Sequence, residues 1–386
     1  MFHRVRPTTI VILAVLSCSA MAADTGAVGN GDWSNAATWT NGVPGVNDSA
    51  YIGCGNPTGA ALDAAVTLSQ DTSAGHVYLG FSYGTSGTID LRGFTLTASD
   101  LTLGVAPGPD TAAIIRRTGG GALVTNSTEA YLGNLVLAPG DMLSGLSVYN
   151  SARVTTGGIG NVTFAAEILS ASAVGSPATL NLGADFKVDF QVFVGGVLNA
   201  NGHAVTAGEI EMGYSSIPGS FQNDGPVTAG SWNQRYGTVA KLHQPGDTLG
   251  SLLLTQNSQL TVSDAAGQTV GLTITDKTYV LPPPPDVAID PGSSLVLEVN
   301  GQAGGWVFRW ANPATGGNHI VELQNLINGG EINFTSLNGG SYSLSADSQY
   351  TYINVVPEPS SLALLAAAGS AAAVVIRRRG NWARSS

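Results

Sequence analysis

The sequence predicts an all-β protein: a right-handed parallel β-solenoid over residues 23–281, followed by a small β unit over residues 286–354. In runs such as residues 94–98 and 101–103, apolar side chains alternate with Thr, which is the pattern of half-buried strands. Clusters of Gly, Asn, Asp and Ser separate such runs at short, fairly regular intervals. Because no amphipathic helix pattern is found between residues 30 and 350, we expect strands to account for the fold.

A degenerate repeat favours the solenoid over other β folds. Its units end in Gly and are Tyr78-Leu79-Gly80, Thr102-Leu103-Gly104, Tyr131-Leu132-Gly133, Phe193-Val194-Gly195 and Glu211-Met212-Gly213. The spacings of the first three glycines lie in the twenties, a period typical of coils that bury their apolar faces against neighbouring coils. A β-sandwich would also have short strands, but glycine at recurrent corners favours the solenoid.

Residues 1–22 have the form of an export signal, with a basic start, an apolar core and an Ala-Met-Ala site. Ala20, Ala22 and Ala23 are the residues of the expected cleavage site, so that the mature chain starts near Ala23. Cys18 loosely imitates the lipid-bearing cysteine of lipoproteins, but the residue two before it is large where a small one is required. The Ala-Met-Ala site is therefore the better prediction.

Once the signal leaves, Cys54 is the single cysteine of the chain, so an internal disulfide cannot form. It lies within a glycine-rich stretch, residues 52–56. We expect a small buried residue at a turn; the alternatives are a reactive thiol and an intermolecular bridge.

Residues 31–52 contain an Asp-Trp, a Thr-Trp, a Gly-Val-Pro-Gly and an Asp, in this order. The string resembles the opening of secreted, autotransporter-like β-helical passengers. Trp33 and Trp39 are expected to cover the open end of the first coil, where free strand edges would promote aggregation. Stacking on a sugar is the alternative role for the two rings.

The predicted C-terminal unit follows four prolines at residues 282–285, a stiff spacer that is incompatible with an interior strand. In a strand, Trp306, Phe308 and Trp310 would share one face, with Arg309 on the other. This row predicts an aromatic core for the unit, and an exposed carbohydrate platform is the alternative.

Residues 355–380 combine a Pro-Glu-Pro motif, a short apolar run and a basic stop. The motif and stop residues are Pro357, Glu358, Pro359, Arg377, Arg378 and Arg379. The uncharged run from Ser361 to Ile376 has sixteen residues, whereas a permanent transmembrane helix usually needs about 20. The basic stop would stay in the cytoplasm, which places the body outside it. A marginal anchor behind an extended, proline-bearing linker suits a processing signal.

The three-part tail resembles the PEP-CTERM sorting signal of Gram-negative envelope proteins. The resemblance implies that an exosortase recognises Pro357, Glu358 and Pro359, cuts nearby, and releases the protein to the surface after transient insertion in the inner membrane. An ordinary membrane anchor that is never cut is the alternative.

The charge of the chain excludes some classes of partner. The 386 residues include 15 basic and 26 acidic side chains, and residues 23–356 keep 9 of the former and 25 of the latter, a formal charge of −16. Such an acidic surface argues against binding of nucleic acid or of other polyanions.

The search for catalytic chemistry finds no assigned site, cofactor or metal. The run Gly80–Gly84 matches Gly-x-Ser-x-Gly, but it leads into a strand and not into the helix of a nucleophile elbow. Glu209 and Glu211 would lie on one strand face about 7 Å apart, a separation compatible with two-carboxylate hydrolysis. The scattered basic residues do not suit a lyase that must hold an acidic sugar.

We therefore expect a secreted, non-enzymatic protein with a structural or adhesive role in exopolysaccharide or biofilm, sorted and cut by an exosortase. The first alternative is a polysaccharide lyase or hydrolase with Glu209 and Glu211 as its acids. The second is a glycan-binding module that uses the aromatic row.

Overall fold

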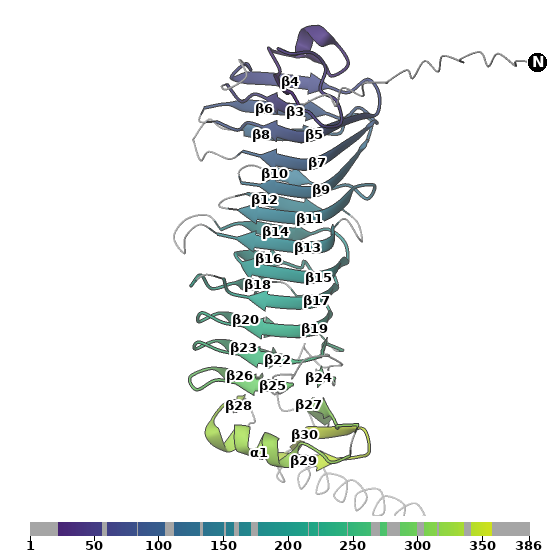
Figure 1. The fold of residues 1–386 in the computed structure, drawn as a ribbon. Helices are drawn as coiled ribbons and strands as arrows, with labels where there is room; N and C mark the ends of the chain where they lie inside the picture. Colours follow the sequence, from purple (N-terminus) through teal and green to yellow (C-terminus); the bar gives the residue numbers. More distant parts are fainter. Residues whose placement is uncertain are drawn as a thin grey trace, which may run out of the picture.

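Parallel strands stacked in successive coils form most of the described chain (Figure 1). The computed structural model describes residues 22–356 except 56–59, 83, 105–111, 132–133, 150–151, 158–161, 171–176, 215, 223, 245, 264–270, 276–285, 299–304, 315 and 336–340. The prediction of a parallel β-solenoid is confirmed, because neighbouring coils pair in parallel from β1 to β28.

Each coil typically places one strand in a large sheet and one short strand in a second stack. The large sheet contains β1 (Asp24–Gly26), β3 (Ser49–Ile52), β5 (Thr72–Leu79), β7 (Thr95–Leu103), β9 (Ala122–Ala130), β11 (Met142–Tyr149), β13 (Val162–Leu169), β15 (Phe186–Gly195), β17 (Val205–Met212), β19 (Val227–Gln234), β21 (Thr248–Leu249), β22 (Leu252–Leu254), β24 (Leu272–Ile274), β25 (Val287–Ile289), β27 (Gly305–Ala311), β29 (Ser341–Ala346) and β30 (Tyr350–Val356).

The second stack consists of three short sheets that follow one another along the solenoid. They contain β2 (Gly31–Asp32), β4 (Asp63–Thr67), β6 (Ser86–Asp90) and β8 (Ala112–Arg116); β10 (Asn134–Val136), β12 (Arg153–Thr156), β14 (Thr179–Leu182), β16 (Val197–Asn199) and β18 (Ser220–Gln222); and β20 (Val239–Leu242), β23 (Gln259–Ser263), β26 (Ser294–Glu298) and β28 (Ile332–Thr335). The two stacks enclose one core.

The predicted repeat corresponds to neighbouring coils of the large sheet. Leu79 pairs with Leu103, so the first glycine spacing equals the length of one coil. Leu103 pairs with Ala130, and the Leu103 carbonyl oxygen accepts a hydrogen bond from the Tyr131 N–H. In the structure, the counterpart of Gly104 in the next coil is therefore Tyr131. The sequence motif would have aligned Gly104 with Gly133, two residues later. The glycine motif thus marks the corner region but not the register.

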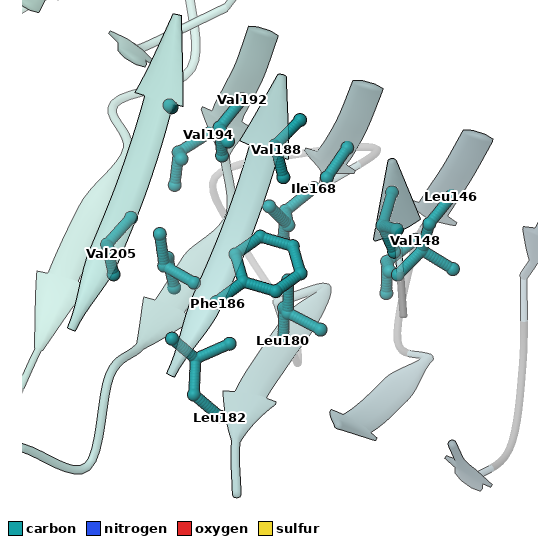
Figure 2. Close-up of a cluster of buried hydrophobic side chains, with 14 of the residues drawn as sticks. Leu146, Val148, Ile168, Leu180, Leu182, Phe186, Val188, Val192, Val194 and Val205 are labelled. Atoms are coloured by element: carbon teal, nitrogen blue, oxygen red, sulfur yellow. The ribbon is translucent and has the colours of Figure 1, made fainter. Parts of the chain in front are cut away.

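The core is a set of aliphatic columns that run along the solenoid. Val148, Ile168, Val194 and Met212 are partners in successive strands, and all four are buried. Figure 2 shows such side chains from neighbouring coils packed against one another in the interior. Burial of an aliphatic side chain is worth about 1.5–3 kcal/mol, so each coil is stabilised mainly by the coils on either side.

The long strands bend where strand pairing skips one residue, and glycines occupy several of these corners. In β17 and β19, pairing skips Gly208 and Gly230. A Cβ atom at Gly230 would lie 2.5 Å from the Gly208 carbonyl oxygen, and one at Gly250 would come still closer to that of Gly230. Adjacent coils approach too closely at this corner for any side chain.

This close approach gives a stability prediction. We expect Gly230→Ala to lower the free energy of unfolding by about 2 kcal/mol, because the methyl group must displace backbone of the next coil. The matched control is Gly140→Ala, whose Cβ would make an ordinary 3.7 Å contact and should change stability by less than about 0.5 kcal/mol. Urea titrations measure both, and equal midpoints would contradict the prediction.

The N-terminal end is closed as predicted. Trp33 and Trp39 are 2% and 4% exposed, with ring centroids 5.0 Å apart in an edge-to-face arrangement. The Trp39 Nε1–H donates to the Trp33 carbonyl oxygen at 2.8 Å. Neither ring has a face open to a sugar, so the stacking alternative is wrong.

At the C-terminal end, the sheet changes from parallel to antiparallel pairing. β27 pairs in parallel with β24 but antiparallel with β30, and β30 pairs antiparallel with β29. Before this change, β25 and β26 pair in parallel with β22 and β23. The solenoid pairing thus crosses the predicted boundary between residues 281 and 286, and the antiparallel cap begins at Gly305.

The structure has one α-helix between residues 30 and 350, where the sequence shows no clear amphipathic pattern. Helix α1 (Ile320–Gly329) packs on this cap with Leu323 buried, and it ends at Gly330 in a left-handed conformation. Its apolar face is narrow and Val321 is exposed. Tertiary packing against β28 and β29, rather than a strong amphipathic pattern, fixes this helix.

Candidate functional site

An outward-facing column of aromatic and polar side chains follows the large sheet along the solenoid. Its members, which we call the outer column, are Tyr51, Tyr78, Thr102, Glu129, Ser147, Glu167, Phe193, Glu211 and Asn233. They are partners in successive strands, so they repeat at the strand spacing of about 4.8 Å. A long surface with regularly spaced side chains suits an extended, repetitive partner.

Stacked tyrosines form part of this surface. The rings of Tyr51 and Tyr78 are 4.7 Å apart and nearly parallel, as are those of Tyr131 and Tyr149 beside the column. Burial raises the pKa of Tyr131 to about 12, and the neighbouring Glu129 adds to this rise. These hydroxyl groups therefore remain protonated hydrogen-bond donors.

Two acids of the outer column, Glu129 and Glu167, are held by hydroxyl groups. The Tyr131 hydroxyl donates to Glu129 at 3.2 Å, while Ser147 and Tyr149 each donate to Glu167 at 3.4 Å. Carboxylates and hydroxyl groups that bind each other in this way present a hydrated polar surface with some apolar ring area.

Glu209 and Glu211 lie on the outer side of β17, as the sequence predicts. Glu209 accepts hydrogen bonds from the amides of Gln191 and Asn233. Glu211 forms an ion pair with Arg235 at 2.6 Å. Burial raises the pKa of Glu211, against the opposing effect of Arg235. Both acids thus have structural partners; Glu209 is half-buried, and Glu211 is only 7% exposed.

The predicted aromatic row does not form. A β-bulge in β27 places Trp306 opposite Asn354 but Phe308 opposite Ile353, which breaks the alternation. Phe308 and Trp310 are buried, whereas the Trp306 ring stacks on the Arg309 guanidinium at 4.4 Å. The prediction of one shared face was wrong, but the prediction of an aromatic core is confirmed for Phe308 and Trp310.

Cys54 is fully buried, and Sγ lies 3.4 Å from the carbonyl oxygens of Ile52 and Tyr78. Ser82, the serine of the Gly-x-Ser-x-Gly run, lies between strands β5 and β6 and donates to the Cys54 carbonyl oxygen at 2.8 Å. The predictions of a buried cysteine and of a strand-to-strand run are both confirmed.

Burial raises the pKa of Cys54 to about 11, so at pH 8 only about one thiol in a thousand is ionised. We expect no labelling of the native protein by a chromogenic disulfide reagent within an hour at pH 8. One equivalent should react in guanidinium chloride, which serves as the control. Rapid labelling of the native chain would show that Cys54 is accessible.

Two buried aspartates occupy the same position in different coils. Asp141 directly precedes β11 and Asp247 directly precedes β21. The Oδ1 atom of each accepts a 2.8 Å hydrogen bond from a backbone N–H of the preceding coil, that of Leu123 for Asp141 and that of Val227 for Asp247. Each aspartate therefore satisfies a strand N–H at a corner.

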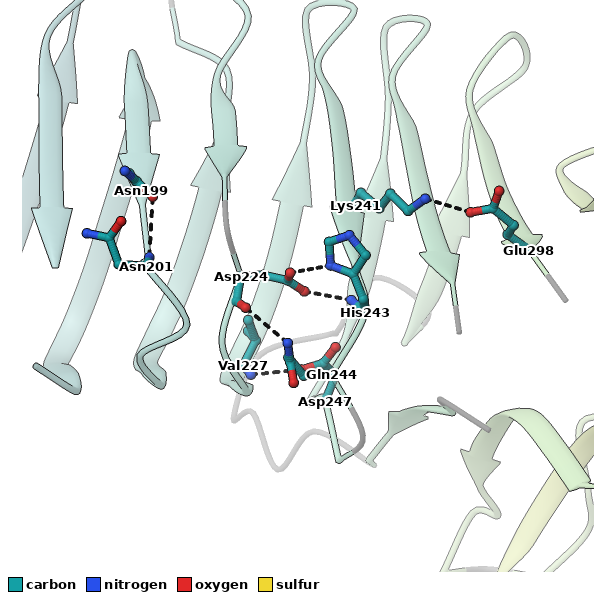
Figure 3. Close-up of polar contacts among 9 residues, drawn as sticks. All are labelled: Asn199, Asn201, Asp224, Val227, Lys241, His243, Gln244, Asp247 and Glu298. Carbon is teal, nitrogen blue, oxygen red and sulfur yellow. Dashed lines mark hydrogen bonds and ion pairs between the residues drawn. The ribbon is translucent and has the colours of Figure 1, made fainter. Parts of the chain in front are cut away.

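The charges around these aspartates are opposite. Asp141 pairs with Arg117 at 2.5 Å. Asp247 instead lies near Asp224, whose carboxylate binds the ring and backbone N–H of His243 (Figure 3). Burial raises the pKa of Asp247 to about 7, and the negative charge of Asp224 acts in the same direction. Its Oδ2 atom has no hydrogen-bond partner within the described chain.

Within the described residues, no three His, Cys, Asp or Glu side chains are placed to hold a metal ion. The same residues include no helix long and apolar enough to cross a membrane. The predicted sorting residues Pro357 to Arg379 lie outside the described residues, as does Ala20 of the predicted signal cleavage site.

The C-terminal region of the sequence, from the end of β30 onward, matches a known family. Residues 355–379 match the family model described as the PEP-CTERM protein-sorting motif. The chain carries a PEP-CTERM sorting signal. This PEP-CTERM signal covers Pro357, Glu358, Pro359 and the three arginines, and it implies export, sorting to the cell surface and processing by an exosortase.

No curated protein and no solved structure matched the chain. The resemblance of residues 31–52 to autotransporter-like passengers therefore stays a prediction.

Proposed function

We propose that this PEP-CTERM protein is a non-enzymatic structural or adhesive component of the cell surface or of an exopolysaccharide matrix, released by exosortase cleavage. The observation that carries the proposal is the position of the sorting signal at the end of a capped solenoid. The match to the signal begins at Val355, within the last strand of the folded body.

The geometry suits display on a surface. The large sheet makes eleven parallel steps from β1 to β25, which is roughly 50 Å at the usual strand spacing. The C-terminal and N-terminal caps lie at opposite ends of the solenoid (Figure 1). A tail held in the membrane would therefore keep the C-terminal cap close to the membrane and the N-terminal cap far from it. The outer column then extends away from the membrane toward extracellular polymer.

A location test follows from this proposal. We expect Glu358→Ala to leave a longer, membrane-retained product, because the central residue of the recognised motif is lost. The control Glu322→Ala removes an exposed acid of α1 and should be processed normally. Fractionation with intact mass measurement distinguishes the two, and normal processing of Glu358→Ala would remove the sorting proposal.

The second candidate function is a polysaccharide lyase or hydrolase, and Glu211 favours it because burial raises its pKa toward that of a general acid. A reducing-sugar assay on the exported protein tests it, with Glu209→Gln and Glu211→Gln as variants. Turnover lost in both would replace the structural proposal. Binding on a glycan array without turnover would support the adhesive role.

A further inference from the structure

Strand β30 joins the folded body directly to the sorting signal. It ends at Val356, one residue before Pro357. The family match starts at Val355, so two residues of the matched region are part of a strand.

β30 is the central strand of the C-terminal cap. On one side Val355 pairs with Gly305 of β27, and on the other it pairs with Tyr342 of β29. Val356 is the last paired residue and lies opposite Ser341 of β29. The backbone of β30 is therefore paired on both edges up to Val355 and on one edge at Val356.

The side chains of β30 also hold it in place. Thr351 and Ile353 are fully buried and Val355 is 7% exposed, whereas Val356 is 39% exposed. Thr351 Oγ1 donates to Asn312 Oδ1 at 2.7 Å and accepts from the His319 N–H at 2.9 Å. Cutting a bond within this strand would require removal of the strand from the cap, and core strands open only rarely.

The other end of the body shows a similar arrangement. Ala23, the predicted first residue of the mature chain, donates its N–H to Asp48 Oδ1 at 2.8 Å, and its carbonyl oxygen accepts from Ser49 at 3.0 Å. β1 follows at once. The folded body thus begins where the export signal is predicted to be removed.

We propose that β30 sets the upstream limit of processing: the bond that the sorting enzyme cuts lies C-terminal to Val356, and the whole strand stays in the released protein. Water adds across one peptide bond, which leaves a carboxylate on the body and an amine on the tail. The inference rests on the proposed release by exosortase. It adds that the recognised motif begins at the residue after Val356, the last paired residue of the cap.

The sequence provides a direct test. No Lys or Arg lies between Arg309 and Arg377, so trypsin yields one peptide from Trp310 to the new C-terminus of the protein recovered from the cell surface. A mass corresponding to an end at Val356 or later supports the inference. An end at or before Val355 overturns it, while the proposed sorting stands.

A second measurement decides the inference even if the surface protein is found uncut, a result that would overturn the proposed release. Proteinase K treatment of the detergent-solubilised full chain should stop at Val356 or beyond. Trimming into β30 would overturn the inference.

Matched variants show whether the strand itself sets the limit. Ile353→Ala weakens the buried side of β30 and should move the proteinase K end upstream of Tyr350, whereas Ile353→Val should leave it unchanged. If circular dichroism shows that Ile353→Ala has lost its β structure, Val355→Ser takes its place. An unchanged end in the folded weakened variant would also overturn the inference.

Discussion

Asp141→Asn should lower the free energy of unfolding by about 3 kcal/mol, because it leaves a largely buried arginine without its counter-charge. The Asp141 side chain is fully buried and that of Arg117 is 16% exposed. The carboxylate accepts from Leu123 N–H, Ala138 N–H and Arg117. An amide keeps the size of the side chain but replaces one acceptor with a donor that faces these donors.

The control for this substitution is Asp189→Asn. Asp189 lies within the long strand β15 and pairs with Lys187 at 3.1 Å, but both side chains are more than half exposed. Exposed pairs contribute about 0–1 kcal/mol, so this variant should stay close to the native protein. Guanidinium titrations of the three proteins provide the comparison. Equal midpoints for Asp141→Asn and the native chain would show that the buried pair has no net effect.

Asp247→Asn should instead raise the free energy of unfolding, and only at neutral and alkaline pH. The pKa of Asp247 is raised from 3.8 to about 7 in the folded protein. The folded state therefore binds this proton more tightly than the unfolded state. Its stabilising contribution is complete below pH 4 and is lost as the pH rises through 7.

The size of this effect follows from the change in pKa. A rise from 3.8 to about 7 corresponds to about 4 kcal/mol, on an order-of-magnitude scale. Asparagine can keep the hydrogen bond to Val227 N–H without an ionisable group. We compare the free energy of unfolding of Asp247→Asn with that of the native protein. We expect this difference to be up to about 4 kcal/mol more favourable to the variant at pH 8.5 than at pH 4.

Native and variant proteins are compared at each pH, so that the effects of other titrating acids on stability largely cancel. Asp224 and His243 are present in both proteins. Asp141→Asn is the natural comparison, because it changes an aspartate at the same coil position with a cation beside it. A pH-independent difference between Asp247→Asn and the native chain would show that Asp247 is ionised in the folded state.

The different surroundings of Asp141 and Asp247 could not be predicted from the sequence. Both follow a glycine and precede a strand, and the local sequences Gly140-Asp141 and Gly246-Asp247 are alike. Their opposite roles come from Arg117 and Asp224, each of which lies about one coil earlier in the chain. Only the lengths of the intervening coils bring each pair together.

The bulge in β27 is a second case. The alternating pattern predicted that Trp306, Phe308 and Trp310 share one face of the strand. A single unpaired residue between Trp306 and Phe308 places Trp306 out of register with the other two. A signal for the corners was present in the sequence, because Ala98 and Leu101 are three positions apart where a straight strand requires two. Both side chains are buried, so this step marks the bend.

The order of the end signals and the period-two pattern were enough to predict an exported β-solenoid, because both depend on local chemistry: hydrophobic runs, charge and strand geometry. The outer column was not foreseeable, because Glu129 and Glu167 share it only through two intervening coils of unequal length, with Ser147 between them. Register depends on the length of every loop in between. Tertiary structure alone therefore decided which side chains reach solvent together and which charges are buried side by side.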